Sequence, residues 1–158
     1  MSGREFNIDD LKIRAMQSAD IRAVSLLEIE IFPDPWPETA FVDFLNNIDA
    51  ICWVTEWDDR IIGYAIFFLG SGEAHLANIA VAPSFRGKYI AKKLISCILE
   101  AVKKAECENI FLDVRPSNDA AINLYRKFGF LDLYYKENYY ISPPEDALVM
   151  VKNIREEG

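Results

Sequence analysis

The chain of 158 residues is poor in the side chains from which disulfide and metal frameworks are built. It has three cysteines, at positions 52, 97 and 107, and one histidine, His75. An odd number of cysteines without C-x-x-C spacing predicts neither a disulfide framework nor a structural zinc site. One histidine excludes metal sites with several histidine ligands, and no G-x-S-x-G motif accompanies it for Ser-His-Asp hydrolysis. We therefore expect reduced thiols and no bound metal.

A basic excess and long apolar runs are also absent. Lys and Arg number 17 against 25 Asp and Glu, so the net charge is −8. Proteins dedicated to nucleic acids or anionic membranes usually carry a basic excess, so we expect neither as a partner. No apolar run approaches the ~20 residues that span a bilayer, and no apolar signal segment follows the polar residues 1–5. These absences predict a cytoplasmic protein.

The residues that are present predict one folded domain. Apolar residues make up 51% of the chain and aromatic residues 13%, which is enough for a substantial core. The length is that of one ordinary domain. We expect a flexible segment at 1–10, a single domain at 11–152 and an acidic tail at 153–158.

Apolar spacing predicts alternating strands and helices. Helices are expected over 19–31 and 38–46, and from residues 90 and 118 onward. Strands are expected over 11–14, 51–57, 61–69, 75–81, 109–114, 130–140 and 147–152. The order β-α-α-β-β-β-α-β-α-β-β combines hairpins with β-α-β crossovers. It predicts an α+β (α/β mixed-sheet) fold with helices on both faces of the sheet.

The first informative stretch, residues 78–94, reads as a strand, a tight loop and the start of a helix. Residues 83–93 hold no acid but four cations: Arg86, Lys88, Lys92 and Lys93. Free N–H groups at the positive end of a helix suit a pyrophosphate. The alternative is a solvated basic helix face, and charge alone does not decide between the two.

The second stretch, residues 113–130, places Asp113 near the end of a strand and Tyr125 two turns into the next helix. Ligands of α/β sheets bind at the carboxyl ends of strands, which favours a functional role for both residues. The alternative for Tyr125 is an aromatic residue of the core.

Together these stretches resemble the GNAT superfamily of acetyl-CoA-dependent N-acetyltransferases, and within it the RimI group of ribosomal-protein-alanine N-acetyltransferases. The similarity covers about residues 11–152. It is carried by the segments 32–36, 78–83, 112–118, 121–125, 128–130, 138–140 and 145–147. Each segment is weak alone, but their order and spacing are specific.

The resemblance implies acetyl-CoA as co-substrate. Its pantetheine arm is implied to run beside Ile79, Ala80 and Val81 and to contact Asn118 and Tyr125. Its pyrophosphate is implied to lie on the main-chain N–H groups of Arg86, Gly87, Lys88, Tyr89, Ile90 and Ala91. One departure concerns this loop, because Tyr89 stands where the superfamily has a glycine that lets the main chain approach phosphate.

The resemblance also implies direct attack of an amine on the thioester. Tyr125 is implied to be the general acid that protonates the departing thiolate, and Asp113 the general base, acting through water. A second departure is that the RimI group has a glutamate at the position of Asp113. His75 is the alternative base, because its strand is expected to border the thioester. An α-amine has a pKa near 7.7–8.0, so its deprotonation near neutral pH costs only about 1 kcal/mol.

For the acceptor, the resemblance implies a slot walled by Phe32, Trp36, Tyr139 and Tyr140. Three functions remain open. The first is acetylation of a protein N-terminus, a ribosomal protein being one candidate that an acidic enzyme would attract. The second is acetylation of a small amine such as a polyamine, and the third is a non-catalytic acyl-CoA-binding module.

Overall fold

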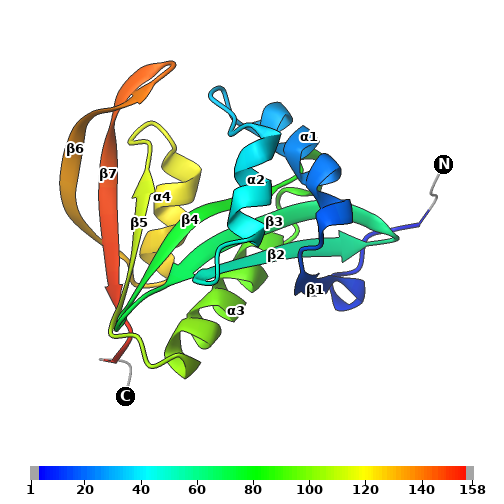
Figure 1. The fold of residues 1–158 in the computed structure, drawn as a ribbon, viewed down its shortest axis with the longest axis horizontal. Helices are drawn as coiled ribbons and strands as arrows, with labels where there is room; N and C mark the ends of the chain where they lie inside the picture. Colours follow the sequence, from blue (N-terminus) through cyan, green and yellow to red (C-terminus); the bar gives the residue numbers. More distant parts are fainter. Residues whose placement is uncertain (1–3, 156–158) are drawn as a thin grey trace. The chain divides into compact units, whose positions relative to one another are not determined.

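Residues 4–155, which the computed structural model describes, contain seven strands and four α-helices in the predicted order (Figure 1). The strands are β1 (Lys12–Ala15), β2 (Ala50–Trp57), β3 (Arg60–Leu69), β4 (Glu73–Val81), β5 (Asn109–Val114), β6 (Leu131–Ile141) and β7 (Pro144–Asn153). The α-helices are α1 (Ile21–Ile31), α2 (Glu38–Leu45), α3 (Ile90–Lys104) and α4 (Asp119–Lys127). Short 3₁₀ helices cover Ile8–Asp10, Ser18–Asp20 and Pro83–Phe85.

The sheet is mixed, as the sequence predicts. Its strand order is β1-β2-β3-β4-β5-β7-β6. Strand β4 runs parallel to β5, whereas β1 with β2, β5 with β7 and β6 with β7 are antiparallel pairs. Helix α3 makes the crossover that two parallel strands require.

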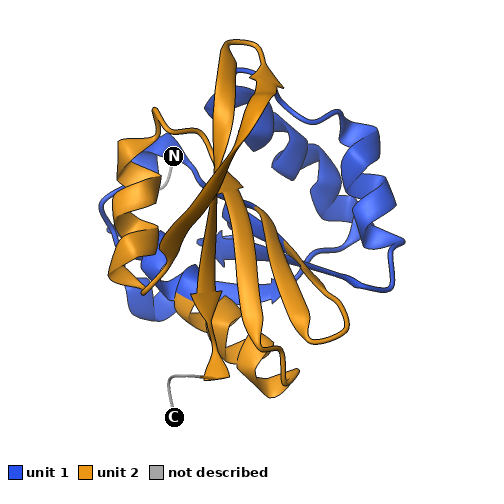
Figure 2. Ribbon diagram, turned by 90° about the vertical axis from the view of Figure 1, so that its left-hand side faces the viewer, with its two compact units in different colours: residues 1–66, 78–95 blue, residues 67–77, 96–158 orange. Residues whose placement is uncertain are grey.

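Contacts between Cα atoms divide the chain into two compact units, coloured separately in Figure 2. Unit 1 consists of residues 1–66 and 78–95, and unit 2 of residues 67–77 and 96–158. The expected single domain at 11–152, with a flexible segment at 1–10 and an acidic tail at 153–158, stays a prediction. Residues 1–3 and 156–158 lie outside the described part of the chain.

Unit 1 builds its core from amphipathic helices on strands. Helices α1 and α2 lie on the same side of β2 and β3 (Figure 1). Their apolar faces bury Val24, Leu27 and Phe41. Near the N-terminus, the ring of Phe6 lies 5.3 Å from that of Trp57, so residues just before β1 are anchored by aromatic packing.

Unit 2 builds its core around β5 and the end of α4. Every second residue of β5, including Ile110 and Leu112, is buried. Helix α4 stops at Gly129, which has a φ of +93°. The N–H of Phe130 then bonds back to the carbonyl of Tyr125 at 3.1 Å, as at many helix ends with a left-handed glycine.

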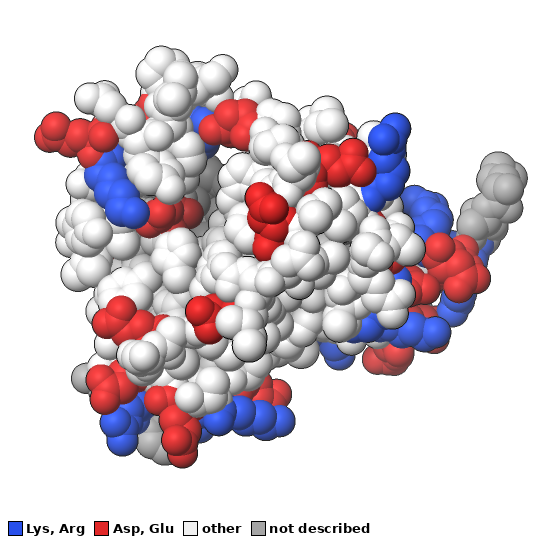
Figure 3. Space-filling view, viewed as in Figure 1, with Lys and Arg blue, Asp and Glu red and all other residues white. Residues whose placement is uncertain are grey.

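The surface mixes charges of both signs. On the face shown in Figure 3, acidic and basic side chains lie in small groups separated by uncharged surface. Among the described residues, no helix is both long and apolar enough to cross a membrane. The three cysteines carry free thiols, and burial raises the pKa of Cys52 to about 11.

Candidate active site

The loop between β4 and α3, in unit 1, offers main-chain donors. The first hydrogen bond of α3 runs from the N–H of Lys93 to the carbonyl of Tyr89, at 3.1 Å. The N–H groups of residues 90–92 precede this bond and have no partner within the helix. The same segment carries four exposed cations: Arg86, Lys88, Lys92 and Lys93. Within residues 4–155 none of the four forms an ion pair, so donors and cations together suit a pyrophosphate.

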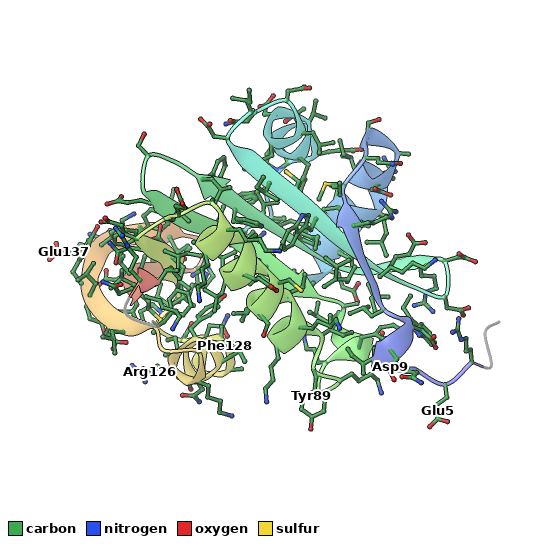
Figure 4. All side chains as sticks on the ribbon, turned by 90° about the horizontal axis from the view of Figure 1, so that it is seen from below. Glu5, Asp9, Tyr89, Arg126, Phe128 and Glu137 are labelled. Atoms are coloured by element: carbon green, nitrogen blue, oxygen red, sulfur yellow. The ribbon has the colours of Figure 1, made fainter. Side chains whose placement is uncertain are left out.

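Tyr89 has the main-chain conformation that a glycine at its position would favour. Its φ is +68°, and that of Gly87, two residues earlier, is +77°. A residue with a Cβ in this region costs about 1–2 kcal/mol. The ring points away from the ribbon (Figure 4), is 67% exposed and lies 5.1 Å from Nζ of Lys92. The loop therefore keeps a glycine-like shape, with the tyrosine ring directed outward.

The second half of β4 carries the residues expected to border the pantetheine arm. The parallel register of β4 with β5 runs from Glu73 to Leu76 and ends before Ile79, Ala80 and Val81. Ala80 is buried. A Cβ on Gly63 would lie 2.8 Å from the carbonyl oxygen of Ala80, so β3 approaches this segment as closely as only a glycine permits.

In unit 2, Asp113 near the end of β5 forms a polar cluster with Lys136 and His75. Its Oδ2 accepts a hydrogen bond from Nζ of Lys136 at 3.2 Å and lies 4.0 Å from Nε2 of His75. Burial lowers the pKa of His75 by more than the charge of Asp113 raises it, so His75 is neutral at neutral pH. Burial opposes the charge of Lys136, but the hydrogen bond and charge of Asp113 raise its pKa overall.

The cluster opens into a pocket of about 470 Å³. Its walls include the aromatic rings of Phe111 and Tyr134 together with the side chain of Lys136. The two candidate bases, Asp113 and His75, therefore share one pocket. No signal in the sequence pointed to Lys136, because it is 23 residues from Asp113 and meets it only through strand pairing.

Tyr125 is buried in unit 2, with its ring centroid 5.7 Å from that of Phe130. Burial, and to a smaller extent Tyr140, raises the pKa of its phenol above the ordinary value, at which a phenol is already protonated at neutral pH. Asn118 begins helix α4 as predicted, with its Oδ1 accepting a hydrogen bond from the N–H of Ala121 at 3.2 Å. This cap fixes the helix that carries Tyr125.

The predicted acceptor residues of unit 2, Tyr139 and Tyr140, lie at the β6–β7 hairpin with their ring centroids 5.0 Å apart. Arg115 follows β5 and holds this hairpin, a role that the sequence did not reveal. Its guanidinium lies 4.1 Å from the ring centroid of Tyr140 and donates to the carbonyl of Pro143 at 2.9 Å. It also lies 3.3 Å from Oε1 of Glu145.

The predicted acceptor residues of unit 1, Phe32 and Trp36, are both half-buried after helix α1. The ring centroid of Trp36 lies 5.1 Å from that of Phe44, and its main-chain N–H donates to Oε2 of Glu28 at 3.0 Å. The sequence analysis did not single out Glu28. The sequence nevertheless contains an indication of its role, because Glu28 is an acid that directly follows Leu27 on the apolar face of a predicted helix.

Comparison with known proteins decides the family. Residues 21–130 match the model of the acetyltransferase (GNAT) family. The chain belongs to the GNAT family. It is therefore an acetyl-CoA-dependent N-acetyltransferase, and the predicted fold and family are confirmed.

Relatives of the GNAT chain extend over nearly its whole length. It is 34% identical over 145 residues to a putative [ribosomal protein bS18]-alanine N-acetyltransferase of Bacillus subtilis, which covers 91% of this chain and 96% of the relative. The crystal structure of the ribosomal-protein-S18-alanine N-acetyltransferase from Escherichia coli superposes with a TM-score of 0.84 at 27% identity, over 91% and 94% of the two chains. NAA60 of Arabidopsis thaliana in complex with acetyl-CoA shares the fold, with a TM-score of 0.82 at 20% identity over 92% and 99%.

The residues present fit the GNAT co-substrate. The loop that begins α3 has main-chain donors, and its cations form no ion pair with the described residues, as suits a pyrophosphate. Within residues 4–155, no group of three or more His, Cys, Asp or Glu side chains is placed to hold a metal ion. Asp113, with 12% of its side chain exposed, and Tyr125, 7% exposed, both lie in unit 2, and their roles as general base and general acid stay predictions.

Proposed function

We propose that this GNAT enzyme acetylates the N-terminal α-amine of a protein, with alanine as the first residue. The observation that carries the proposal is the 34% identity, over 91% of the chain, to a relative named as a [ribosomal protein bS18]-alanine N-acetyltransferase. The net charge of −8 supports a basic protein as the acceptor, because complementary charge raises the rate of encounter.

In this proposal the chain's own residues hold the co-substrate, which supplies a thioester that an amine can attack. Ile79, Ala80 and Val81 offer main-chain groups to the pantetheine arm, and Asn118 contacts it. The N–H groups from Gly87 to Ala91 hold the pyrophosphate, supported by the cations of the loop, whereas the N–H of Arg86 already donates to the carbonyl of Pro83 at 3.3 Å. Holding both substrates in place supplies most of the rate acceleration.

Asp113 takes the proton from the attacking amine nitrogen through a water molecule. A weak base suffices, because an α-amine has a pKa near 7.7–8.0. His75 lies 4.0 Å from Asp113 and is neutral, so it can accept a proton in turn. Tyr125 donates the proton of its Oη to the departing thiolate, which the raised pKa of its buried phenol keeps available. General acid and base catalysis of this kind contributes about 10²–10⁴-fold.

In the proposal the acceptor-binding residues are Phe32 and Trp36 of unit 1 and Tyr139 and Tyr140 of unit 2. Two of these residues, Trp36 and Tyr140, are held by contacts within their own units. The N–H of Trp36 is bound by Glu28, and Tyr140 stacks under the guanidinium of Arg115.

Mass spectrometry of reaction products tests the proposal. The enzyme is mixed with acetyl-CoA and peptides that differ only in the first residue, with spermidine, free lysine and an N-terminally blocked peptide as controls. The expected result is one added acetyl group on the α-amine of the alanine peptide and none on the blocked peptide. Transfer only to spermidine or lysine would replace the proposal with a small-amine acetyltransferase. Binding of acetyl-CoA without transfer to any amine would indicate a non-catalytic acyl-CoA-binding module.

A further inference from the structure

Glu28 is a buried acid of unit 1 that forms no ion pair with any residue of the described range, 4–155. Only 2% of its surface is exposed. The other buried acid of this unit, Asp20, is paired with the guanidinium of Arg14 at 2.7 Å. Glu28 instead accepts hydrogen bonds from neutral groups alone: the hydroxyl of Tyr64, Nδ2 of Asn78 at 2.8 Å and the N–H of Trp36 at 3.0 Å.

Stability of the fold does not account for a carboxylate at this place. Removing a carboxylate from water without a cationic partner is costly, and neutral hydrogen bonds offset the cost only in part. Replacing a buried polar group together with its partners by apolar side chains of similar volume is often neutral or stabilising. The neighbouring positions of α1, Val24 and Leu27, are apolar and buried. The presence of an acid at position 28 therefore indicates that Glu28 serves to position the groups that it binds.

The three partners of Glu28 come from three different parts of unit 1. Trp36 belongs to the loop between α1 and α2, which prolines at 33, 35 and 37 stiffen. Asn78 lies on β4, directly before Ile79. Tyr64 lies on β3, and its ring packs edge-on against Phe41 of α2 with centroids 5.9 Å apart.

The two carboxylate oxygens of Glu28 bind different parts of unit 1. Oε1 accepts from Tyr64 and Asn78, both on strands of the sheet, whereas Oε2 accepts from Trp36 in the loop. A single rigid carboxylate thus sets the position of Trp36 relative to Asn78.

We infer that Glu28 is a positioning residue, which fixes the wall of the acceptor slot at Trp36 relative to the strand that holds the pantetheine arm. This role rests on the proposed function. In this role Glu28 contacts neither substrate. Its loss should therefore change the Michaelis constant for the peptide and leave the chemical step unchanged.

Glu28→Gln tests the inference selectively. An amide has one acceptor oxygen, which satisfies two donors by facing Tyr64 and Asn78, so its NH₂ group then faces the N–H of Trp36. The loop loses its bond while the strands keep theirs. We expect the KM for an alanine-initial peptide to rise about tenfold, with kcat and the KM for acetyl-CoA within about twofold of wild type.

The matched control is Glu30→Gln, the same change on an exposed residue of the same helix, which should leave all three constants unchanged. Hydrogen exchange followed by mass spectrometry supplies a readout independent of activity. Exchange in the peptide that contains Trp36 should accelerate in Glu28→Gln and not in Glu30→Gln. If Glu28→Gln does not fold, Glu28→Asp, whose shorter side chain withdraws from the loop, should raise the peptide KM in the same direction.

The outcomes separate the two proposals. If the wild type acetylates the peptide and the Glu28 variants keep its KM and the exchange rate at Trp36, the positioning role is wrong and the proposed function stands. If the wild type acetylates no peptide, the proposed function is wrong, and the positioning role fails with it.

Discussion

The ammonium of Lys136 donates a hydrogen bond to Oδ2 of Asp113 across 3.2 Å. The two residues belong to β6 and β5, and only 12% of the Asp113 side chain is exposed, against 38% for Lys136. The candidate base therefore sits at the inner end of an ion pair whose outer end reaches solvent. The hydrogen bond holds the carboxylate of Asp113 in one orientation at the pocket of unit 2.

Asp113→Asn should lower kcat/KM for the alanine peptide by about 10²–10⁴-fold, because it removes a general base. Asp113→Glu is the matched control, since it keeps a carboxylate, and it should retain most of the activity. Steady-state kinetics with both variants measures the difference. Turnover of Asp113→Asn at the wild-type rate would instead favour His75 as the base, and the His75→Gln variant would then lose activity.

Tyr125→Phe should lower kcat by about 10²–10⁴-fold, because it removes the proton that the leaving thiolate receives. The ring stays in place against Phe130, so the melting temperature should change little. Tyr135→Phe, at an exposed tyrosine of the same unit, is the control and should leave kcat unchanged. A kcat of wild-type size in Tyr125→Phe would show that the thiolate departs without this acid.

Tyr89→Gly should be more stable than Tyr89→Ala by about 1 kcal/mol. Both changes remove the ring and its contact with Lys92, but only glycine accepts a φ of +68° without strain. Urea denaturation of the two variants measures the difference in the free energy of unfolding. Equal stabilities would mean that the loop relaxes out of the left-handed conformation once the tyrosine is gone.

Gly63→Ala should destabilise the protein by about 1–3 kcal/mol, because its Cβ would lie 2.8 Å from the carbonyl oxygen of Ala80 and overpacking costs this much. It should also weaken binding of acetyl-CoA, since Ala80 must move. The control is Gly70→Ala, whose Cβ would lie 3.5 Å from its nearest neighbour, the carbonyl oxygen of Glu73. Thermal melts with and without acetyl-CoA distinguish the variants, and equal melting temperatures would contradict the close approach of β3 to β4.

The stability of the protein should fall as the pH drops below about 6.5, in part because of His75. Burial lowers the pKa of His75 in the folded state, so the unfolded chain binds this proton more readily than the native protein does. Above the pKa that His75 has in the unfolded chain, its contribution to the free energy of unfolding is fully present. This contribution is lost as the pH falls through the lower pKa of His75 in the folded protein. Asp113 and Lys136 face the imidazole, and their opposite charges act on it in opposite directions.

His75→Gln removes this contribution. Urea denaturation between about pH 5 and pH 7.5 should show a shallower pH dependence for the variant than for the wild type. Parallel curves would mean that the imidazole is as free to take up a proton in the folded protein as in the unfolded chain.

Local signals in the sequence were sufficient for the elements and for much of the site. The spacing of Val24 and Leu27 predicted α1, and Asn118 and Gly129 marked the two ends of the helix that carries Tyr125. The loop after β4 carries four cations and no acid, which made it a candidate for pyrophosphate binding without excluding a solvated basic face. These features depend on neighbours within one or two turns of the chain, which is the range over which sequence patterns are informative.

Contacts between distant segments could not be read in this way. Glu28 meets Tyr64 and Asn78, which follow it by 36 and 50 residues. Lys136 reaches Asp113 only because β6 pairs with β7, with register shifts after Asp132 and after Lys136. A shift of one residue in a strand moves a side chain to the opposite face, so no local pattern could place Lys136 beside the candidate base.

The sequence by itself determined the order of the elements, the family, the co-substrate and the candidate acid and base, because these follow from local periodicity and from motifs at fixed spacing. The tertiary structure alone decided what surrounds each of these groups. Strand register gave Asp113 its ammonium partner, and burial raised the pKa of the Tyr125 phenol. The packing of α1 with β3 and β4 enclosed Glu28 among neutral donors. The orientation and charge state of a catalytic group depend on neighbours that folding brings together, and these determine how the chemistry proceeds.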